Sequence, residues 1–261
     1  MSVPAVELGR VVERLRASGC VFAEDEAALI AETARDAAEL TAMVDQRVAG
    51  QPLEYVVGWA SFCGLRIVVD PGVFIPRRRT EFLVAEALRV TVAGSVVVDL
   101  ACGSGALGAA VAAEREVSLY AADIESAAVR CARRNLDPVG GTVSQGDLFA
   151  ALPERLRGRV DVLLANVPYV PTGEIRLLPA EARLYEPHVT LDGGADGLET
   201  LRRVVAEAPQ WLAPGGHLFT ETSEGQAPVA QAVMVEHGLE AEVVADDDLG
   251  ATVVHGTYTR R

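Results

Sequence analysis

Beyond Gly94 the sequence alternates short apolar runs with segments of helical periodicity, and this alternation restricts the fold more than any other feature. Apolar runs bounded by turn residues are typical of parallel strands that are buried on both faces. Repeated strand–helix units predict an α/β fold of the Rossmann-like class, with a mostly parallel, doubly wound sheet. The expected strands are 95–100, 118–122, 160–165, 217–222, 240–245 and 251–258, and the expected helices between them are 106–113, 126–135, 199–211 and 226–237.

The first part of the chain has a different pattern. Apolar residues recur three and four positions apart from about residue 3 to residue 48, which predicts a small helical domain. Residues 55–69 are rich in β-branched and aromatic side chains, and Gly64 stands where a hairpin could turn. A further helix is expected at 80–90, with Thr80 as its N-cap. The expected organisation is a helical docking domain at 1–50, a linker with a β-hairpin at 51–76 and the α/β domain at 77–261.

The charge balance excludes several classes of function. The chain carries 23 basic and 37 acidic residues, a formal net charge of −14. This charge opposes broad contact with nucleic-acid phosphates, because such contact relies on basic side chains that release counterions. No Lys occurs, so Schiff-base and lysine-base chemistry has no candidate residue. We therefore expect no direct binding of nucleic acid.

The spacing of cysteines, histidines and apolar residues bears on metals and on cellular location. The four cysteines form no Cys-x-x-Cys pair, which fits neither a zinc site nor a disulfide framework. The four histidines stand apart in sequence, and we expect them to be structural or exposed, with no metal ligand among them. Neither a signal pattern nor an apolar stretch of about 20 residues is found. We expect a cytoplasmic protein that does not enter the membrane.

A glycine loop follows the first expected strand of the α/β domain and opens the next helix. The strand ends in Asp99 and Leu100, and the loop Ala101-Cys102-Gly103-Ser104-Gly105 comes directly after it. Small residues let the backbone approach a ligand closely, above the N-terminus of the following helix. The loop lacks the Gly-x-Gly-x-x-Gly spacing of a dinucleotide fingerprint. Taken alone, it also fits an ordinary strand-to-helix turn.

Three carboxylates favour an adenosine ligand at this loop. Asp123 comes 20 residues after Gly103, at the end of the next expected strand, where a carboxylate can accept hydrogen bonds from both ribose hydroxyls. Asp147, followed by Leu148, stands beyond a further short apolar stretch. Asp99 could order the loop near a cationic amino group, which S-adenosyl-L-methionine carries and NAD does not. The expected cofactor is therefore S-adenosyl-L-methionine.

The expected strand 160–165 ends in Asn166-Val167-Pro168-Tyr169, at the carboxyl edge of the sheet. An amide nitrogen is a poor nucleophile because its lone pair is delocalised into the carbonyl, so an enzyme must hold both N–H groups and aim the nitrogen. The Asn166 side-chain oxygen and the Val167 carbonyl could accept these N–H groups. Tyr169 could stack on the planar amide and exclude water, so that catalysis is mainly positioning and needs no general base. A turn with a core Tyr is the structural alternative.

From about Gln51 to the C-terminus the chain resembles the family of protein-(glutamine-N5) methyltransferases, which modify the Gly-Gly-Gln motif of class I peptide chain release factors. Many methyltransferases have a glycine loop, and several classes share an acceptor motif like Asn-Pro-Pro-Tyr. The later block 191–198 is therefore the specific part of the resemblance. The matching blocks are 50–53 with Gly58, 74–77 with 80–81, 99–105, Asp123, 147–148, 166–169, 186–187 and 191–198.

The resemblance implies a fold, an activity and a set of site residues. The fold would be that of a class I methyltransferase, and the activity would be transfer of a methyl group from S-adenosyl-L-methionine to the N5 nitrogen of a protein glutamine. Asn166, Pro168 and Tyr169 would be the catalytic residues, and Val167 would join them in binding the glutamine. Contacts to the cofactor would come from Ala101, Cys102, Gly103, Ser104, Gly105, Asp123, Leu148 and Asn166, and the chemical interpretation adds Asp99 and Asp147.

Three features depart from the family pattern. Val167 stands where a second proline is usual, so the carbonyl acceptor is kept but the fixed φ of proline is lost. The helical N-terminal region is shorter than usual by about one helix. The run 77–79 consists of three Arg residues, and we interpret it as a solvated edge rather than as a contact with an acidic or RNA-associated partner. These departures indicate a paralogue whose partner is a release factor or a related glutamine-bearing protein.

Three other functions remain open from the sequence. A methyltransferase of exocyclic amines in adenine or guanine would use the same acceptor geometry, with a flipped base against Tyr169, although the negative charge opposes it. A small-molecule N-methyltransferase would suit the more open pocket beside a short N-terminal domain. A regulatory module that only binds S-adenosyl-L-methionine would not need Asn166 and Tyr169.

Overall fold

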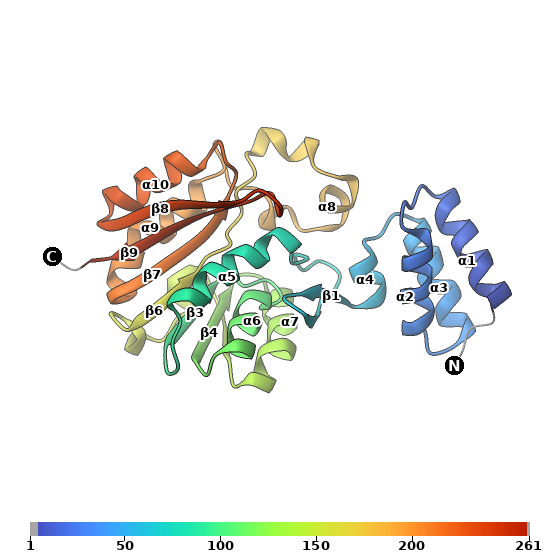
Figure 1. Ribbon diagram of the computed structural model, residues 1–261, viewed down its shortest axis with the longest axis horizontal. Coiled ribbons are helices and arrows are strands. Elements are labelled where there is room, and N and C mark those ends of the chain that lie inside the picture. The colour runs from blue at the N-terminus through green and yellow to red at the C-terminus, as the bar shows by residue number, and fades with distance from the viewer. Residues whose placement is uncertain (1–4, 260–261) are drawn as a thin grey trace.

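Seven strands form one mixed sheet in this computed structural model, which describes residues 5–259 (Figure 1). They are β3 Val96–Leu100, β4 Ser118–Asp123, β5 Thr142–Gln145, β6 Val160–Leu164, β7 Leu212–Thr222, β8 Leu239–Asp246 and β9 Ala251–Tyr258. The strand order is β5-β4-β3-β6-β7-β9-β8. The first five strands in this order are parallel, and β9 pairs antiparallel with β7 and β8. The predicted Rossmann-like, mostly parallel fold is confirmed.

One strand begins well before its expected start. β7 starts at Leu212 rather than at 217, and it includes the Pro-Gly-Gly run 214–216, which suggests a turn in the sequence. The pairing with β6 accommodates the run, because Val160 pairs with Leu212 whereas Val162 pairs with His217. Extra residues at such a bulge remain outside the ladder, so a pattern of regular alternation does not reveal them.

Helices cover both faces of the sheet (Figure 1). They are α5 Glu81–Val90, α6 Ala106–Glu114 and α7 Ser126–Leu136 on one face, and α9 Glu199–Trp211 and α10 Ala227–Glu236 on the other. Side chains alternate in direction along a strand, so Val97 of β3 joins the core under α5 to α7, while Val98 joins the core under α9 and α10. Leu83 and Trp211 are fully buried in these two cores.

The N-terminal residues form a helical body with its own core (Figure 1). Its helices are α1 Ala5–Ala17, α2 Ala23–Thr33 and α3 Ala37–Val48. Leu15, Ile30 and Val44 are buried between them. The Asp36 side chain caps α3 by accepting a hydrogen bond of 2.8 Å from the Glu39 backbone N–H. Residues 1–4 and 260–261, which belong to the first and last expected domains, lie outside the described range.

A β-hairpin follows this body, as the sequence predicts. β1 Trp59–Phe62 pairs antiparallel with β2 Leu65–Val68. The turn residues Cys63 and Gly64 have φ values of 48° and 73°, a backbone region that favours glycine at the second position.

Two expectations about helix starts are wrong. Residues 55–57, expected at the start of the hairpin, belong instead to the helix α4 Leu53–Val57, because Val56 and Val57 pack into the core of the helical body and this burial outweighs their β propensity. Thr80 does not cap α5 with its side chain. It ends the 3₁₀ turn Arg78–Thr80 with a φ of −69° and a ψ of −13°, whereas an N-cap residue needs a non-helical backbone.

The short helix α8 Ala180–Tyr185 is bound to the helical body. Arg47 of α3 forms ion pairs of 2.5 Å with Glu26 and 2.6 Å with Glu181. The Tyr185 hydroxyl donates a hydrogen bond of 2.9 Å to the Ala49 carbonyl. These contacts join α3 directly to a segment that comes late in the α/β body.

The other short elements are 3₁₀ helices of three to six residues. They are Arg78–Thr80, Asp137–Val139, Leu148–Ala151, Glu154–Leu156, Thr172–Leu177 and His188–Thr190. Among residues 5–259, no helix combines the length and the apolar character that crossing a bilayer requires.

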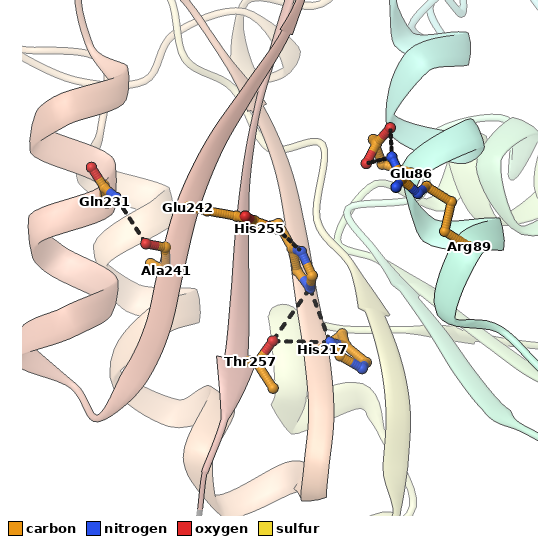
Figure 2. A network of polar contacts seen from close by, with 8 residues as sticks. All are labelled: Glu86, Arg89, His217, Gln231, Ala241, Glu242, His255 and Thr257. Carbon is orange, nitrogen blue, oxygen red and sulfur yellow. Dashed lines mark hydrogen bonds and ion pairs between the residues drawn. The ribbon is translucent and has the colours of Figure 1, made fainter.

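A polar network lies on β7, β9 and β8, within the sheet (Figure 2). The two ring nitrogens of His255 lie 2.9 Å from His217 Nδ1 and 3.2 Å from Glu242 Oε1, and Thr257 Oγ1 lies 3.1 Å from His217 Nδ1. Phe219 stacks on His255 with 4.3 Å between ring centroids. Burial lowers the pKa of both histidines. The network is a structural link between the antiparallel strands.

Candidate active site

The carboxyl ends of β3, β4 and β6 open into a cavity of about 500 Å³. Open α/β sheets bind their ligands at this edge. Apolar side chains such as Phe74, Leu107 and Leu178 line the cavity together with polar groups. Of the predicted site residues, all but Gly105 line it: Asp99, Ala101, Cys102, Gly103, Ser104, Asp123, Asp147, Leu148, Asn166, Val167, Pro168 and Tyr169.

The glycine loop has a preset backbone conformation. Ala101 and Gly103 have φ values of 52° and 54°, and the Gly103 N–H donates a hydrogen bond of 2.8 Å to the Asp123 side chain. Gly105 lies behind the loop, where a Cβ would come within 2.9 Å of Leu136 on α7, and its φ is 77°. Close packing of two helices therefore explains Gly105.

The Asp123 carboxylate joins the loop to the end of β4. Its two oxygens accept backbone hydrogen bonds from Gly103 at 2.8 Å and Glu125 at 2.9 Å. Burial raises its pKa, and these N–H groups oppose the rise. Each carboxylate oxygen has a second lone pair, so the side chain can also accept hydrogen bonds from hydroxyls of a ligand in the cavity.

Asp99 is the most deeply buried acid of the site, with a relative exposure of 1%. It accepts a hydrogen bond of 3.0 Å from the Gly108 N–H. Burial raises its pKa to about 8, the Gly108 hydrogen bond opposes the rise, and the charge of Asp123 adds to it. The carboxyl group is therefore largely protonated at neutral pH, and a cation in the cavity would favour its ionised form.

Asp147 and Leu148 lie on the wall of the cavity beyond β5. Asp147 forms an ion pair of 2.6 Å with Arg203 of α9, and both side chains are about half exposed. Leu148 is buried and has a φ of 47°, which turns the chain into the following 3₁₀ helix. The Arg203 partner is not indicated by any sequence pattern.

The acceptor loop 166–169 leaves the end of β6. Val167 is buried in the core under α9 and α10. Asn166 is half-buried and lines the cavity, and within residues 5–259 its side-chain amide makes no hydrogen bond. The amide is therefore available to a ligand through both its oxygen and its N–H groups.

Tyr169 is held at its hydroxyl and at its backbone. The hydroxyl donates a hydrogen bond of 2.6 Å to Glu221 and accepts one of 2.8 Å from Arg79. The backbone carbonyl accepts a hydrogen bond of 2.8 Å from the Gln226 side chain. Burial and the nearby Glu221 charge raise the pKa of the phenol, so Tyr169 is protonated at neutral pH.

The glycine-rich segment 191–198 packs directly on the acceptor loop. The Gly193 N–H donates to the Val170 carbonyl at 2.9 Å. A Cβ on Gly193 would lie 2.7 Å from the Pro168 carbonyl oxygen, and a Cβ on Gly197 would lie 2.3 Å from that of Tyr169. Only glycine fits at these two positions, which gives a physical reason for the specificity of this block.

The solvated interpretation of the arginine run 77–79 is wrong for two of its three members. Arg77 forms an ion pair with the buried Glu186, and Arg79 forms one of 2.8 Å with Glu221, whose side chain is 2% exposed. Arg78 is exposed. The two pairs span more than 100 residues of sequence, so local charge patterning cannot reveal them.

Thr80, which the sequence offers as a helix cap and within the matching block 80–81, lies in the wall of the cavity. Its side chain lines the cavity, its relative exposure is 1%, and its hydroxyl has no partner within the described residues. A buried hydroxyl without a partner is costly unless a ligand or water completes it. The position of Thr80 beside Phe74 and Arg77 in the cavity wall is therefore typical of a ligand contact.

The cavity fits S-adenosyl-L-methionine in its chemistry. Asp123 offers acceptors for ribose hydroxyls, Asp99 offers a carboxyl for a cationic amino group, and Thr80 offers the hydroxyl without a partner. The apolar walls suit an adenine ring. In the described range 5–259, no group of three His, Cys, Asp or Glu side chains is arranged to hold a metal ion.

Comparisons with known proteins agree with this geometry. Residues 64–182 match the family model described as the methyltransferase small domain. A release factor glutamine methyltransferase of Geobacter sulfurreducens is 37% identical over 82% of this chain and 75% of its own length. A release factor glutamine methyltransferase of Streptomyces coelicolor is 38% identical over 71% of this chain and 69% of its own length.

Solved structures agree on the fold. A methyltransferase from Pyrococcus furiosus superimposes with a TM-score of 0.55 at 17% identity, covering 76% of this chain and 90% of that chain. The E. cuniculi Mtq2–Trm112 complex, described as responsible for methylation of the termination factor eRF1, superimposes with a TM-score of 0.51 at 22% identity, covering 72% of this chain and 99% of that chain. At these identities the likeness concerns the fold alone.

Proposed function

The chain belongs to the family of release factor glutamine methyltransferases, and from this premise we propose that it methylates the N5 nitrogen of the Gly-Gly-Gln glutamine in a class I peptide chain release factor. The methyl donor of this enzyme family is S-adenosyl-L-methionine. The observation that carries the proposal is the open Asn166 amide, which lies in one cavity with the glycine loop and with Tyr169. A cofactor end and an amide-binding end thus meet in the same space.

The cofactor end binds and orients the donor. Asp123 accepts the ribose hydroxyls while its bond to Gly103 keeps the loop in place. Leu148, Thr80 and Asp99 would hold the cofactor through apolar contact, a hydroxyl and a carboxyl group, respectively. When bound, S-adenosyl-L-methionine would supply an electrophilic methyl group, and the break of its S–CH3 bond would leave the neutral thioether S-adenosyl-L-homocysteine.

The acceptor end holds the glutamine amide. The Asn166 side-chain oxygen and the Val167 carbonyl accept its two N–H groups, and Tyr169 covers the amide plane and excludes water. This arrangement aims the nitrogen at the methyl group, so the rate gain comes from orientation. The proton leaves to solvent after transfer, because methylation makes the nitrogen cationic, and no side-chain base is required.

Val167 replaces a proline at little cost to the geometry of the loop. The Val167 side chain is buried in the sheet core, and Pro168 restricts the backbone of the residue before it. The contacts of Tyr169 restrict the loop from the other side. Packing therefore supplies the rigidity that a proline ring would give.

The helical body serves as the docking domain for the protein substrate, with domain limits of 1–50, 51–76 for the linker and 77–261 for the methyltransferase domain. α8 supports this role because it lines the cavity with Glu181 and Ala182 while Arg47 and Tyr185 join it to the helical body. The substrate class and the four free thiols of the chain are in keeping with action in the cytoplasm.

Transfer of labelled methyl groups to purified release factor tests the function. We expect labelling of the release factor that is lost when the glutamine of Gly-Gly-Gln is replaced by alanine, and that is lost with the enzyme variant Asn166→Ala. Labelling of nucleic acid or of small molecules from a cell extract in a parallel reaction, without labelling of the release factor, would assign the cavity to one of the alternative amine acceptors.

A further inference from the structure

We propose that the segment 221–226, which comprises the end of β7 and the turn after it, is a positioning element that holds Tyr169 from both ends, through Glu221 at the hydroxyl and Gln226 at the backbone carbonyl. The inference rests on the proposed function, because it assigns to Tyr169 the task of covering the acceptor amide. Neither Glu221 nor Gln226 lines the cavity. Any effect they have on catalysis therefore passes through the residues that they hold, which are Tyr169 at both ends and Arg79, itself a residue of the cavity wall, at the hydroxyl end.

The hydroxyl end is a closed ring of three hydrogen bonds. Tyr169 donates to Glu221 Oε1 at 2.6 Å, Arg79 Nη2 donates to the Tyr169 hydroxyl at 2.8 Å, and Arg79 Nε donates to Glu221 Oε1 at 2.8 Å. The second oxygen of Glu221 is buried and has no partner within the described residues. One oxygen of the buried Glu221 carboxylate accepts hydrogen bonds from both Arg79 and Tyr169. These bonds fix the position and the direction of the phenol.

At the carbonyl end, Tyr169 is bound by the side-chain amide of Gln226, which makes hydrogen bonds through both its nitrogen and its oxygen. Gln226 Nε2 donates to the Tyr169 carbonyl and to the Asp196 carbonyl, each at 2.8 Å. Gln226 Oε1 accepts from the Ser223 backbone N–H at 3.3 Å and from the Thr222 hydroxyl at 3.0 Å. Carbonyls only accept and a backbone N–H only donates, so the orientation of the amide is determined by its partners.

The Gln226 amide also packs closely against Gly197. A Cβ on Gly197 would lie 2.2 Å from Gln226 Nε2. Gln226 thus binds the acceptor loop, through Tyr169, to the glycine-rich segment, through Asp196. The two ends together set where the ring of Tyr169 stands relative to Asn166, and a misplacement of about 1 Å at such a site can cost about a hundredfold in rate.

Two nearly isosteric variants test the positioning role. Gln226→Glu removes the two N–H donors, and Glu221→Gln removes the charge that faces Arg79. The matched control is Gln231→Glu on α10, since Gln231 Nε2 also donates to a backbone carbonyl, that of Ala241, at 2.8 Å (Figure 2). With a release factor as substrate, we expect kcat to fall about tenfold to a hundredfold for the two test variants. The KM for the release factor and the Kd for S-adenosyl-L-methionine should stay within about threefold of those of the control.

A double-mutant cycle separates positioning from general stability. If Glu221 acts through the Tyr169 hydroxyl, Glu221→Gln causes no further loss of kcat once Tyr169→Phe is present. Losses that multiply in the double variant would overturn the inference, as would a kcat for Gln226→Glu equal to that of Gln231→Glu.

Nuclear magnetic resonance with ¹³Cζ-labelled tyrosine gives a readout that needs no substrate. The chain has five tyrosines, and the Tyr169 signal is the one that disappears in Tyr169→Phe. We expect Glu221→Gln and Gln226→Glu to shift this signal and Gln231→Glu to leave it in place. An unshifted Tyr169 signal in both test variants overturns the inference. If the wild-type enzyme does not label release factor, the proposed function is overturned instead. The Tyr169 signal still tests the positioning role, because it is measured without substrate.

Discussion

The hydroxyl of Tyr169 lies 2.6 Å from a carboxylate oxygen of Glu221, across 52 residues of sequence. The contact joins the acceptor loop after β6 to the end of β7, and Arg79 completes it from the segment before α5. Three elements that are distant in sequence therefore determine the position of one aromatic ring.

The ion pair of Arg79 with the buried Glu221 carboxylate should contribute to the stability of the fold. Arg79→Met leaves Glu221 without its cation, so we expect the free energy of unfolding to fall by about 1–3 kcal/mol, less than for a fully buried pair because Arg79 is partly exposed. Its exposed neighbour provides the control, since Arg78→Met should change stability by less than about 0.5 kcal/mol. Urea denaturation of both variants measures the difference. Equal free energies of unfolding for Arg79→Met and Arg78→Met would contradict a stabilising ion pair between Arg79 and Glu221.

Cofactor affinity should depend on pH through Asp99. Its pKa is raised to about 8 in the free protein, and a bound cationic amino group lowers it again, so binding releases a proton. Affinity for S-adenosyl-L-methionine should therefore rise by about tenfold between about pH 6 and pH 7.5. Titration calorimetry measures this slope, and Asp99→Asn should flatten it. A wild-type affinity that is constant over this range would contradict the role of Asp99.

Two glycines with the same backbone conformation provide a test of the packing on the acceptor loop. Gly197 and Gly215 have φ values of 80° and 81°, but only at Gly197 would a Cβ meet other atoms, at 2.2 Å. Both alanine variants carry the strain of positive φ, about 1–2 kcal/mol. Gly197→Ala should lose further stability and most of its kcat, whereas Gly215→Ala should keep its kcat. Comparable activities in the two variants would show that the close packing is not required.

The docking role of the helical body depends on the contact between α3 and α8. Arg47→Ala removes the ion pair with Glu181 together with the one with Glu26, and we expect the KM for the release factor to rise about threefold to tenfold while the Kd for S-adenosyl-L-methionine stays constant. Arg14→Ala removes the ion pair with Asp45, which lies wholly within the helical body, and should leave both constants unchanged. An unchanged KM in Arg47→Ala would contradict a role of the contact between α3 and α8 in substrate docking.

The sequence predicts those features that depend on neighbouring residues. Buried strands are short apolar runs between turns, so their existence is visible even where the bulge at 214–216 hides the start of β7. The glycine loop and the acceptor loop are continuous motifs, and their residues meet because parallel strands end at the same edge.

Contacts between distant segments were not predictable in this way. The partners of Arg77 and Arg79, Glu186 and Glu221, are 109 and 142 residues away. A run of three arginines has the pattern of a solvated surface, and only the folded chain shows that two of them meet buried acids. The capping pattern assigns the Thr80 hydroxyl wrongly to the N-cap of α5. Thr80 is part of a 3₁₀ turn, Arg78–Thr80, which such a pattern does not reveal.

The most direct measurement is a mass spectrum of the release-factor peptide that contains Gly-Gly-Gln, after incubation with the enzyme and S-adenosyl-L-methionine. We predict one added methyl group, placed by fragmentation on the glutamine side chain, with no addition when Asn166→Ala replaces the wild-type enzyme. An unmodified glutamine, with wild-type enzyme that binds S-adenosyl-L-methionine in the same sample, would contradict the assignment of the acceptor.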